Sequence, residues 1–300
     1  MELRTLMYFT VIAKEGSMTH ASNALHVTQP TLSRQMKALE EELGVKLFTR
    51  SNYNIQLTEA GTLLKKRADE ILSMSQKVQD EFKVLDSKVK GDVFIGCGET
   101  KGMSFISKII KDIQLDYPDV HFHIYSGNFD DVTEKLDKGL LDFGILIQPA
   151  NLNKYKAVHL PSSDIWGLIA KRSSELAQKS YVTREDLVNL PLICSRQAID
   201  ETHASNEFTG WFGHLFSDLN IVATFNLAYN AGLLVEENVG YAVTIDSIID
   251  VSKENGLCFI PLSPKLEAKH NIIWRKNHTF SKASELFLEK LLKKTMYKRK

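Results

Sequence analysis

The segment that most restricts the fold is TQPTLSRQMKALEEEL, residues 28–43, which has the pattern of one amphipathic helix. Thr28 can cap its start, Pro30 suits its first turn, and Gly44 can end it. Leucine and methionine recur every three or four positions, which predicts one buried side. The other side presents hydrogen-bonding groups to solvent, and they come from Gln29, Thr31, Ser33, Arg34, Gln35 and Lys37.

Two shorter helices precede this segment, ending at Gly16 and at Leu25. After the segment, the stretches VKLF and NIQL can form the two strands of a small β-wing. Residues 1–60 therefore predict three short helices joined by tight turns and followed by a wing. A compact three-helix core of this kind is what a helix-turn-helix requires.

A helix-turn-helix reads DNA with the N-terminal residues of one helix, placed in a major groove about 12 Å wide. Gln29 can hydrogen-bond an adenine edge, and Thr31 can pack its methyl group on a thymine methyl. Ser33, Arg34 and Lys37 can contact phosphates or guanine. The alternative is that these side chains form the solvated face of an ordinary helix.

The net charge does not indicate a nucleic-acid partner, because the chain has 37 basic and 37 acidic residues. Residues 1–90 hold 13 Lys or Arg and 11 Asp or Glu, so a DNA argument depends on local placement. No apolar run approaches the roughly 18–20 residues of a membrane span, and the N-terminus has no signal-peptide pattern. Three scattered cysteines indicate neither a disulfide framework nor a metal site. We therefore expect a cytoplasmic protein with no membrane partner, metal or cofactor.

Residues 58–88 predict one long helix of roughly 45 Å, at about 1.5 Å per residue. A narrow stripe on so long a helix suggests a partner helix, and hence a homodimer. The alternative is packing against the core of the same chain. The stripe repeats every three or four positions at Leu64, Ala68, Ile71, Ser75, Val78, Phe82, Leu85 and Val89.

The periodicity changes after Gly91, where strands and helices begin to alternate. VFIGCG, VHFHIYSG and LDFGILIQ read as strands separated by helices, and a second α/β set starts at DIWGLIAK and includes a helix over 201–216. HNIIWRK and a helix from Ser281 complete the chain. Two such units predict two lobes with a cleft between them. We place lobe I at about 91–161 and 267–300, and lobe II at about 162–266.

The first 60 residues resemble the winged helix-turn-helix of the LysR-type transcriptional regulators. The similarity is carried by ASNALHVTQPTLSRQ, residues 21–35, and LGVKLF, residues 43–48. It implies an α+β multi-domain protein with a DNA-binding domain at 1–60, a linker and dimerisation helix at 58–90, and an effector-binding domain at 91–300. That last domain would have two α/β lobes, like periplasmic binding proteins. The resemblance also implies an operator DNA, a small-molecule effector, RNA polymerase and a second copy of the chain as partners, with a homotetramer formed through the effector domains.

The resemblance assigns DNA contacts residue by residue. It places base or groove contacts at Gln29, Pro30, Ser33 and Arg34, with flanking contacts at Thr28, Thr31 and Lys37, while Arg50 leads into the wing. One departure concerns the wing tip, where the family often has a second basic residue and this chain reads SNYN. Asn52 or Asn54 would have to replace that charge for the wing to contact the minor groove.

The effector site follows from the rule that ligands of open α/β sheets lie at the carboxyl ends of strands, beside helix N-termini. Lys101 and Arg196 would suit an anion such as a carboxylate, whereas Glu99 could neutralise Lys101. The rule also selects Gly127, Ser195, Gln197 and Phe225. The effector-binding residues that we predict are Thr100, Lys101, Ser126, Asn128, Gln148, Arg196, Thr202 and Asn226.

Three other functions compete with this interpretation. A redox-sensing regulator would need a reactive thiol, but Cys97 and Cys194 lie in apolar strands typical of buried cysteine. An enzyme is disfavoured because catalytic and phosphate-binding motifs are missing. His121 and His123 share one face of a strand, but no further metal ligands lie nearby in the sequence, so we interpret them as surface histidines. A solute-binding protein would need export. The sequence therefore favours a transcriptional regulator without catalytic residues.

Overall fold

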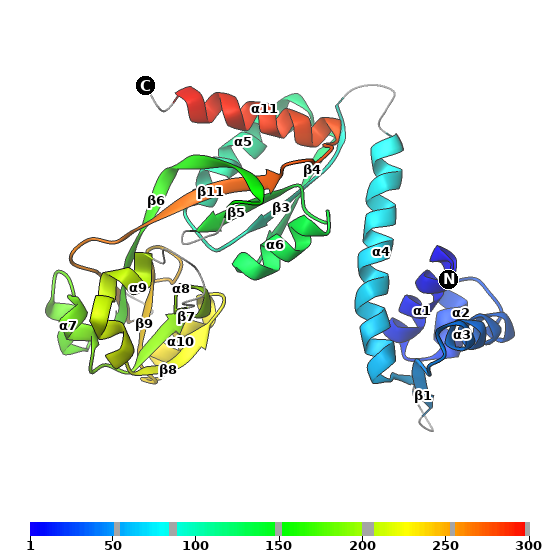
Figure 1. Cartoon of the computed structure of the whole chain (residues 1–300), viewed down its shortest axis with the longest axis horizontal. Coiled ribbons are helices and arrows are strands. Elements are labelled where there is room, and N and C mark those ends of the chain that lie inside the picture. Colours follow the sequence, from blue (N-terminus) through cyan, green and yellow to red (C-terminus); the bar gives the residue numbers. More distant parts are fainter. Residues whose placement is uncertain (51–54, 84–88, 148–151, 200–206, 253–255, 298–300) are drawn as a thin grey trace. The chain divides into compact units, whose positions relative to one another are not determined.

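A computed structural model describes residues 1–50, 55–83, 89–147, 152–199, 207–252 and 256–297 of the chain. The chain divides into two compact units, Met1–Asp86 and Ser87–Lys300, and Figure 1 draws their helices and strands. Among the described residues, no helix is long and apolar enough to cross a membrane.

The first unit has three short helices, a two-stranded wing and one long helix. Its core is a single cluster built around the fully buried Phe9, Leu32 and Leu39. Gly16 and Gly44 end the first and third helices in the left-handed conformation, as the sequence predicts. The elements are α1 (Leu3–Glu15), α2 (Met18–Ala24), α3 (Gln29–Leu43), β1 (Phe48–Arg50), β2 (Ile55–Leu57) and α4 (Glu59–Lys83).

The apolar stripe of α4 faces two environments. Ala68 is buried in the core of the first unit and Leu64 packs against that core, so the first part of the stripe binds its own domain. Ile71 and Val78, farther along the stripe, are instead exposed, at 39% and 43%. These two residues, the exposed apolar stripe of α4, do not belong to the apolar cluster formed by the described residues of the unit. The side chain of Phe82 and residues 84–88 lie outside what the structure describes.

Gly61 holds the start of α4 against the wing. A Cβ atom at this position would lie 2.1 Å from the carbonyl oxygen of Leu47, a backbone atom that cannot move aside easily. The Thr58 hydroxyl donates to the Lys46 carbonyl at 2.7 Å beside it. The long helix is therefore fixed to the helix-turn-helix by close backbone packing.

The second unit is a nine-stranded sheet, with eight strands in the order β4-β3-β5-β11-β6-β9-β7-β8 and β10 paired with β6. Parallel pairs form within each half, β3 with β4 and β5, and β7 with β8 and β9, which confirms two α/β lobes. The strands are β3 (Gly91–Cys97), β4 (Val120–Ser126), β5 (Phe143–Ile147), β6 (Tyr155–Lys171), β7 (Leu192–Ser195), β8 (Ile221–Phe225), β9 (Tyr241–Ile245), β10 (Leu257–Pro261) and β11 (Glu267–Arg275).

Strand β6 begins about nine residues earlier than the sequence predicts and, with β11, connects the two lobes. The register slips here, because Ser163 lies opposite Lys269 whereas His159 lies opposite Asn271. Pro161 falls inside this bulge, where the backbone needs no ladder N–H. Because this proline and the polar residues around it interrupt the apolar pattern, the sequence did not predict the first part of the strand.

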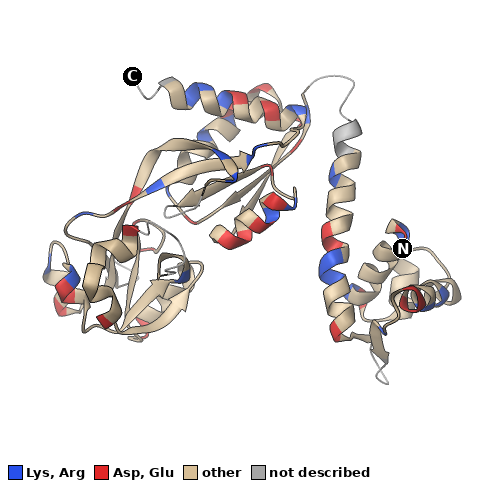
Figure 2. Cartoon of the chain, in the orientation of Figure 1, with Lys and Arg blue, Asp and Glu red and all other residues tan. Residues whose placement is uncertain are grey.

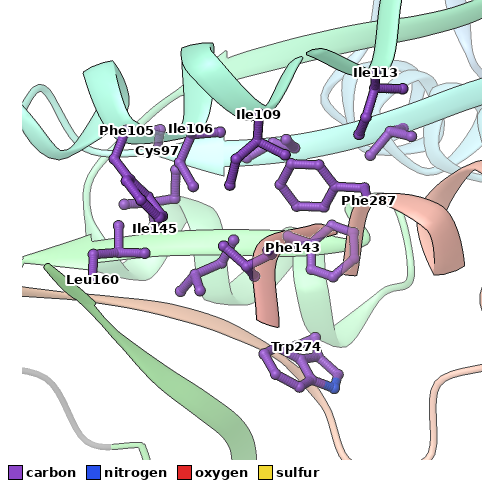
Figure 3. Packing of buried hydrophobic residues seen from close by; sticks show 14 of the residues in the cluster. Cys97, Phe105, Ile106, Ile109, Ile113, Phe143, Ile145, Leu160, Trp274 and Phe287 are labelled. Atoms are coloured by element: carbon purple, nitrogen blue, oxygen red, sulfur yellow. The ribbon is translucent and has the colours of Figure 1, made fainter. Parts of the chain in front are cut away.

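Helices cover both lobes, and each lobe has its own core. In lobe I, Ile109 of α5 and Phe287 of α11 pack over Phe143 of β5 (Figure 3). In lobe II, Phe208 and Phe212 pack beside Trp166. The helices are α5 (Gly102–Asp116), α6 (Phe129–Asp137), α7 (Arg184–Leu187), α8 (Arg196–Ile199), α9 (Glu207–Phe212), α10 (Tyr229–Glu236) and α11 (Lys282–Tyr297), with 3₁₀ turns η1 (Glu175–Gln178) and η2 (Gly213–Asp218).

The long helix predicted over 201–216 was wrong in its described part. Residues 207–212 form the short α9, and Gly213 then takes a positive φ of 59° and starts the 3₁₀ turn η2. A left-handed residue cannot continue an α-helix, so α9 ends there, and it is α9 that carries the buried Phe208, Trp211 and Phe212.

Candidate DNA-binding helix and interlobe cavity

The start of α3 is capped as the sequence predicts. The Thr28 hydroxyl accepts the Thr31 N–H at 3.4 Å and contacts the Thr31 hydroxyl at 2.9 Å, while Pro30 lies in the first turn. Leu32 and Met36 turn into the core. The N-terminal end of α3 is thus capped, packs one side on the core and keeps its outer face in solvent.

That outer face carries most of the predicted DNA contacts. Gln29, Pro30, Arg34 and Lys37 are exposed, and Ser33 is half-buried beside them. No described residue forms an ion pair with Arg34, and Lys37 only approaches Glu41 at 3.6 Å. Basic and acidic residues both occur along α4 (Figure 2).

Glu40 has a role that the sequence did not reveal. Its carboxylate accepts the backbone N–H of Leu47 at 2.8 Å and pairs with Lys46 at 2.8 Å, so it ties the end of α3 to the wing. Burial alone would raise the pKa of Glu40, but these hydrogen bonds and the one from Phe48 lower it below its ordinary value. Arg50 is the last residue of β1 and leads into the wing tip. Its side chain and the wing tip at 51–54 lie outside the described structure.

A cavity opens between lobe I and lobe II, where the carboxyl ends of the parallel strands meet. The cavity has a volume of about 70 Å³, which is room for a small molecule. Lobe I contributes Gly98, Glu99, Gly127, Asn128 and Ile147. Lobe II contributes Ser195, Gln197, Ala198, Phe225, Asn226 and Ala228, and the strands β6 and β9 add Trp166, Thr244 and Ile245.

Polar contacts link the lobes around this cavity. The Ala228 N–H donates to Glu99 Oε2 at 2.7 Å. The Gln197 amide accepts the Phe129 N–H at 3.2 Å and donates to the Ile147 carbonyl at 3.3 Å. These bonds join the start of α6 in lobe I and the start of α10 in lobe II to residues of the opposite lobe. The cavity is therefore partly closed by the protein itself.

The predicted effector residues are only partly brought together. Asn128 and Asn226 line the cavity, as do Glu99, Gly127, Ser195, Gln197 and Phe225, which the strand-end rule had also selected. Gln148 and Thr202 fall outside the described residues. Four predicted residues, Thr100, Lys101, Ser126 and Arg196, are not among the lining residues.

The two cations chosen for an anionic ligand do not line the cavity. Lys101 forms an ion pair with Asp246 of the other lobe, and Arg196 is exposed at the start of α8. Strand-end position placed these residues near the cleft, but the direction of a side chain depends on its packing. The expected anion therefore lacks the cationic partners on which its prediction rested.

Thr100 belongs instead to a buried polar network. Its hydroxyl donates to Asp164 Oδ2 at 2.6 Å, and His270 Nε2 lies 3.0 Å from the same oxygen. Asp164 and His270 are fully buried, and Ser162 lies 3.3 Å from His270 Nδ1. A Cβ atom on Gly102 would come within 2.9 Å of His270, so glycine permits the close approach of α5. The network ties α5 to the crossing strands β6 and β11.

The cysteines lack the environment of a reactive thiol. Burial raises the pKa of Cys97 to about 12, helped by the negative charges of Asp164 and Glu99. Burial also raises the pKa of Cys194 to about 12, and it raises the pKa of the half-buried Cys258. The thiolate is the reactive form of cysteine, so these shifts oppose a redox-sensing role.

We expect Cys97 and Cys194 to resist iodoacetamide in the native protein near pH 8, and to react once the chain is unfolded. Above the ordinary thiol pKa of 9.0 the unfolded chain ionises while the folded chain does not. The free energy of unfolding should therefore fall between pH 9.0 and about 12. Mass spectrometry of labelled peptides measures the reactivity, and rapid native labelling of either cysteine would restore the redox hypothesis.

Of the two strand histidines, His123 has a carboxylate and an aromatic partner. His123 Nε2 lies 2.7 Å from Asp92 Oδ1, and the His123 ring stacks on Phe94 with centroids 4.7 Å apart. His121 is exposed on the same strand. Within the described residues no group of three or more potential ligands could hold a metal ion.

Comparison with known proteins agrees with this two-part architecture. Residues 3–62 match the family model described as bacterial regulatory helix-turn-helix protein, lysR family. Residues 86–295 match the LysR substrate binding domain. The first match ends within the first turn of α4, and the second begins after α4.

Relatives and solved structures extend the similarity over nearly the full length. The HTH-type transcriptional regulator YwbI of Bacillus subtilis (strain 168) is 30% identical over 290 residues, covering 96% of this chain and 95% of its own. The regulator YtlI of the same organism is 29% identical, covering 87% and 83%. The crystal structure of full-length CbnR with its target DNA has a TM-score of 0.74 at 22% identity, covering 98% and 99%. These matches, together with the capped α3 and the two-lobed sheet, show that the chain belongs to the LysR family of transcriptional regulators, with a helix-turn-helix DNA-binding domain and an effector-binding domain.

Proposed function

We propose that α3 reads the operator through Gln29, Pro30, Ser33 and Arg34, with Thr28, Thr31 and Lys37 holding phosphates. The observation that carries this proposal is the capped start of α3, whose outer side chains are exposed. The N-terminal end of a helix favours phosphate, because its first N–H groups lack intrahelical partners. Arg50 would contact the DNA backbone beside the wing.

Replacing Arg34 or Gln29 with alanine should weaken operator binding by about 1–3 kcal/mol and relax the base preference at one position. Lys37→Ala should weaken binding evenly across sequences and lower its salt dependence, because a phosphate contact carries no sequence information. Mobility-shift titrations on DNA flanking the protein's own gene provide the measurement.

Arg172→Ala is the matched control, since this arginine is exposed in the second unit, where it donates to the Val251 carbonyl at 2.8 Å. It should bind like the parent. If the Arg34 and Gln29 variants also bind like the parent, α3 does not read bases.

Two copies of the chain should pair through the exposed apolar stripe of α4, which supports a homodimer. Pairs of dimers would then form a tetramer through the effector domains. Such a dimer presents two α3 helices to two half-sites of a symmetric operator. Binding at a promoter places the protein in the cytoplasm, beside RNA polymerase as a further partner.

The effector should bind in the interlobe cavity, where residues from both lobes converge. A ligand held there touches lobe I and lobe II at once, so it can favour one arrangement of the lobes over another. It can shift the regulator only by the difference in its affinity for the two arrangements. Operator DNA would change effector affinity by the same factor.

A further inference from the structure

We infer that the interlobe cavity takes a small organic cation with an N–H donor, such as a primary ammonium group, and not an anion. This inference rests on the proposed role of the cavity as the effector site. It is carried by Glu99, the single charged side chain among the described residues that line the cavity.

The helix starts beside the cavity offer an anion little, because protein groups already occupy them. Glu99 Oε2 accepts the Ala228 N–H at the start of α10. At the start of α6, Asn128 and Asp131 form a capping box and the Gln197 amide accepts the Phe129 N–H. An anion bound at either helix would have to displace a bond that the protein makes with itself.

The N-terminus of α5 is closed in the same way. The Thr100 hydroxyl oxygen accepts the Gly102 N–H at 2.9 Å, and the hydroxyl donates to Asp164. Lys101, the nearest cation in sequence, is neutralised by Asp246. At each of the three helix starts, an N–H donor that a carboxylate or phosphate ligand could use is therefore already paired within the protein.

The remaining groups suit a cation. Only one oxygen of Glu99 has a partner among the described residues, so Oε1 can accept a charge-assisted hydrogen bond. Trp166 and Phe225 line the same cavity, and aromatic faces attract ammonium groups. The hydroxyl oxygens of Ser195 and Thr244 offer further acceptors.

Isosteric probes separate charge from shape in the full-length protein. Benzylamine, benzyl alcohol and benzoate have similar size and differ in charge, and isothermal titration calorimetry measures their affinities. For the parent protein we expect benzylamine to bind at least about tenfold more tightly than benzoate. Benzoate binding as tightly as benzylamine, or no benzylamine binding at millimolar concentration, would overturn the inference.

Glu99→Gln keeps an oxygen that can accept the Ala228 N–H but removes the charge, and it should lose about tenfold in benzylamine affinity with little change for benzyl alcohol. Glu99→Asp should keep the preference for the cation. Glu237→Gln, the same change at an exposed position after α10, should behave like the parent. An unchanged ratio of amine to alcohol affinity in Glu99→Gln would contradict the role of Glu99.

Titrating operator DNA with and without benzylamine distinguishes the inferred charge of the ligand from the proposed regulatory role of the cavity. Benzoate preference in a protein that still binds its operator would overturn the charge assignment alone. Benzylamine binding through Glu99 that leaves operator affinity unchanged would argue against the cavity as a regulatory site, while the inferred ligand class would stand.

Discussion

Replacing Ile71 and Val78 together with aspartate should halve the mass of the assembled protein. Both side chains lie on the exposed apolar stripe of α4, seven residues apart, at 39% and 43% exposure. In a symmetric pair of helices each substitution occurs twice in the same contact. Burying unpaired carboxylates there should cost several kcal/mol, more than such a contact can offset.

Sedimentation of the full-length protein at micromolar concentration measures this effect. Operator affinity should fall with it, because a half-assembled protein loses the gain from binding two half-sites at once. Ser73→Asp is the control, since Ser73 is exposed on the other side of α4. A monomeric parent protein, or an aspartate variant that keeps the parent mass, would rule out pairing through this stripe.

Asp164→Ala should destabilise the effector domain by about 3 kcal/mol, because it removes the shared acceptor of a buried network. Thr100 donates to this carboxylate and His270 lies 3.0 Å from it, both away from water. Their polar atoms would lose a partner that solvent cannot replace. Because the network joins α5 to β6 and β11, the loss should also loosen the connection between the lobes.

Thermal unfolding of the full-length protein, followed by circular dichroism, measures this change. Asp164→Asn keeps the shape and one acceptor and should lose less stability than Asp164→Ala. Asp119→Ala, at an exposed position before β4, should unfold like the parent. If Asp164→Ala unfolds at the parent temperature, the network does not stabilise the fold.

Local chemistry explains why so much of the DNA-binding domain could be predicted. The caps at Thr28, Gly16 and Gly44 act within one helical turn, so their residue types identify the helix ends directly. The apolar spacing of Leu32, Met36 and Leu39 likewise marks the buried side. The role of Glu40 could not be predicted, because its hydrogen bond to Leu47 spans seven residues and no local sequence pattern indicates it.

The sequence by itself determined the helix-turn-helix, the long helix, the two α/β units and the strand ends at which the cavity forms, because periodicity, caps and strand order are properties of neighbouring residues. Only the tertiary structure decided which side chains enter the cavity. Lys101 turns to Asp246 and Thr100 to Asp164, whereas Glu99 remains at the cavity and caps α10. Each of these choices depends on a partner more than 60 residues away, supplied by the crossing strands or by the other lobe. The sign of the charge at the candidate effector site follows from those distant partners, so it could not be predicted from residue types at strand ends.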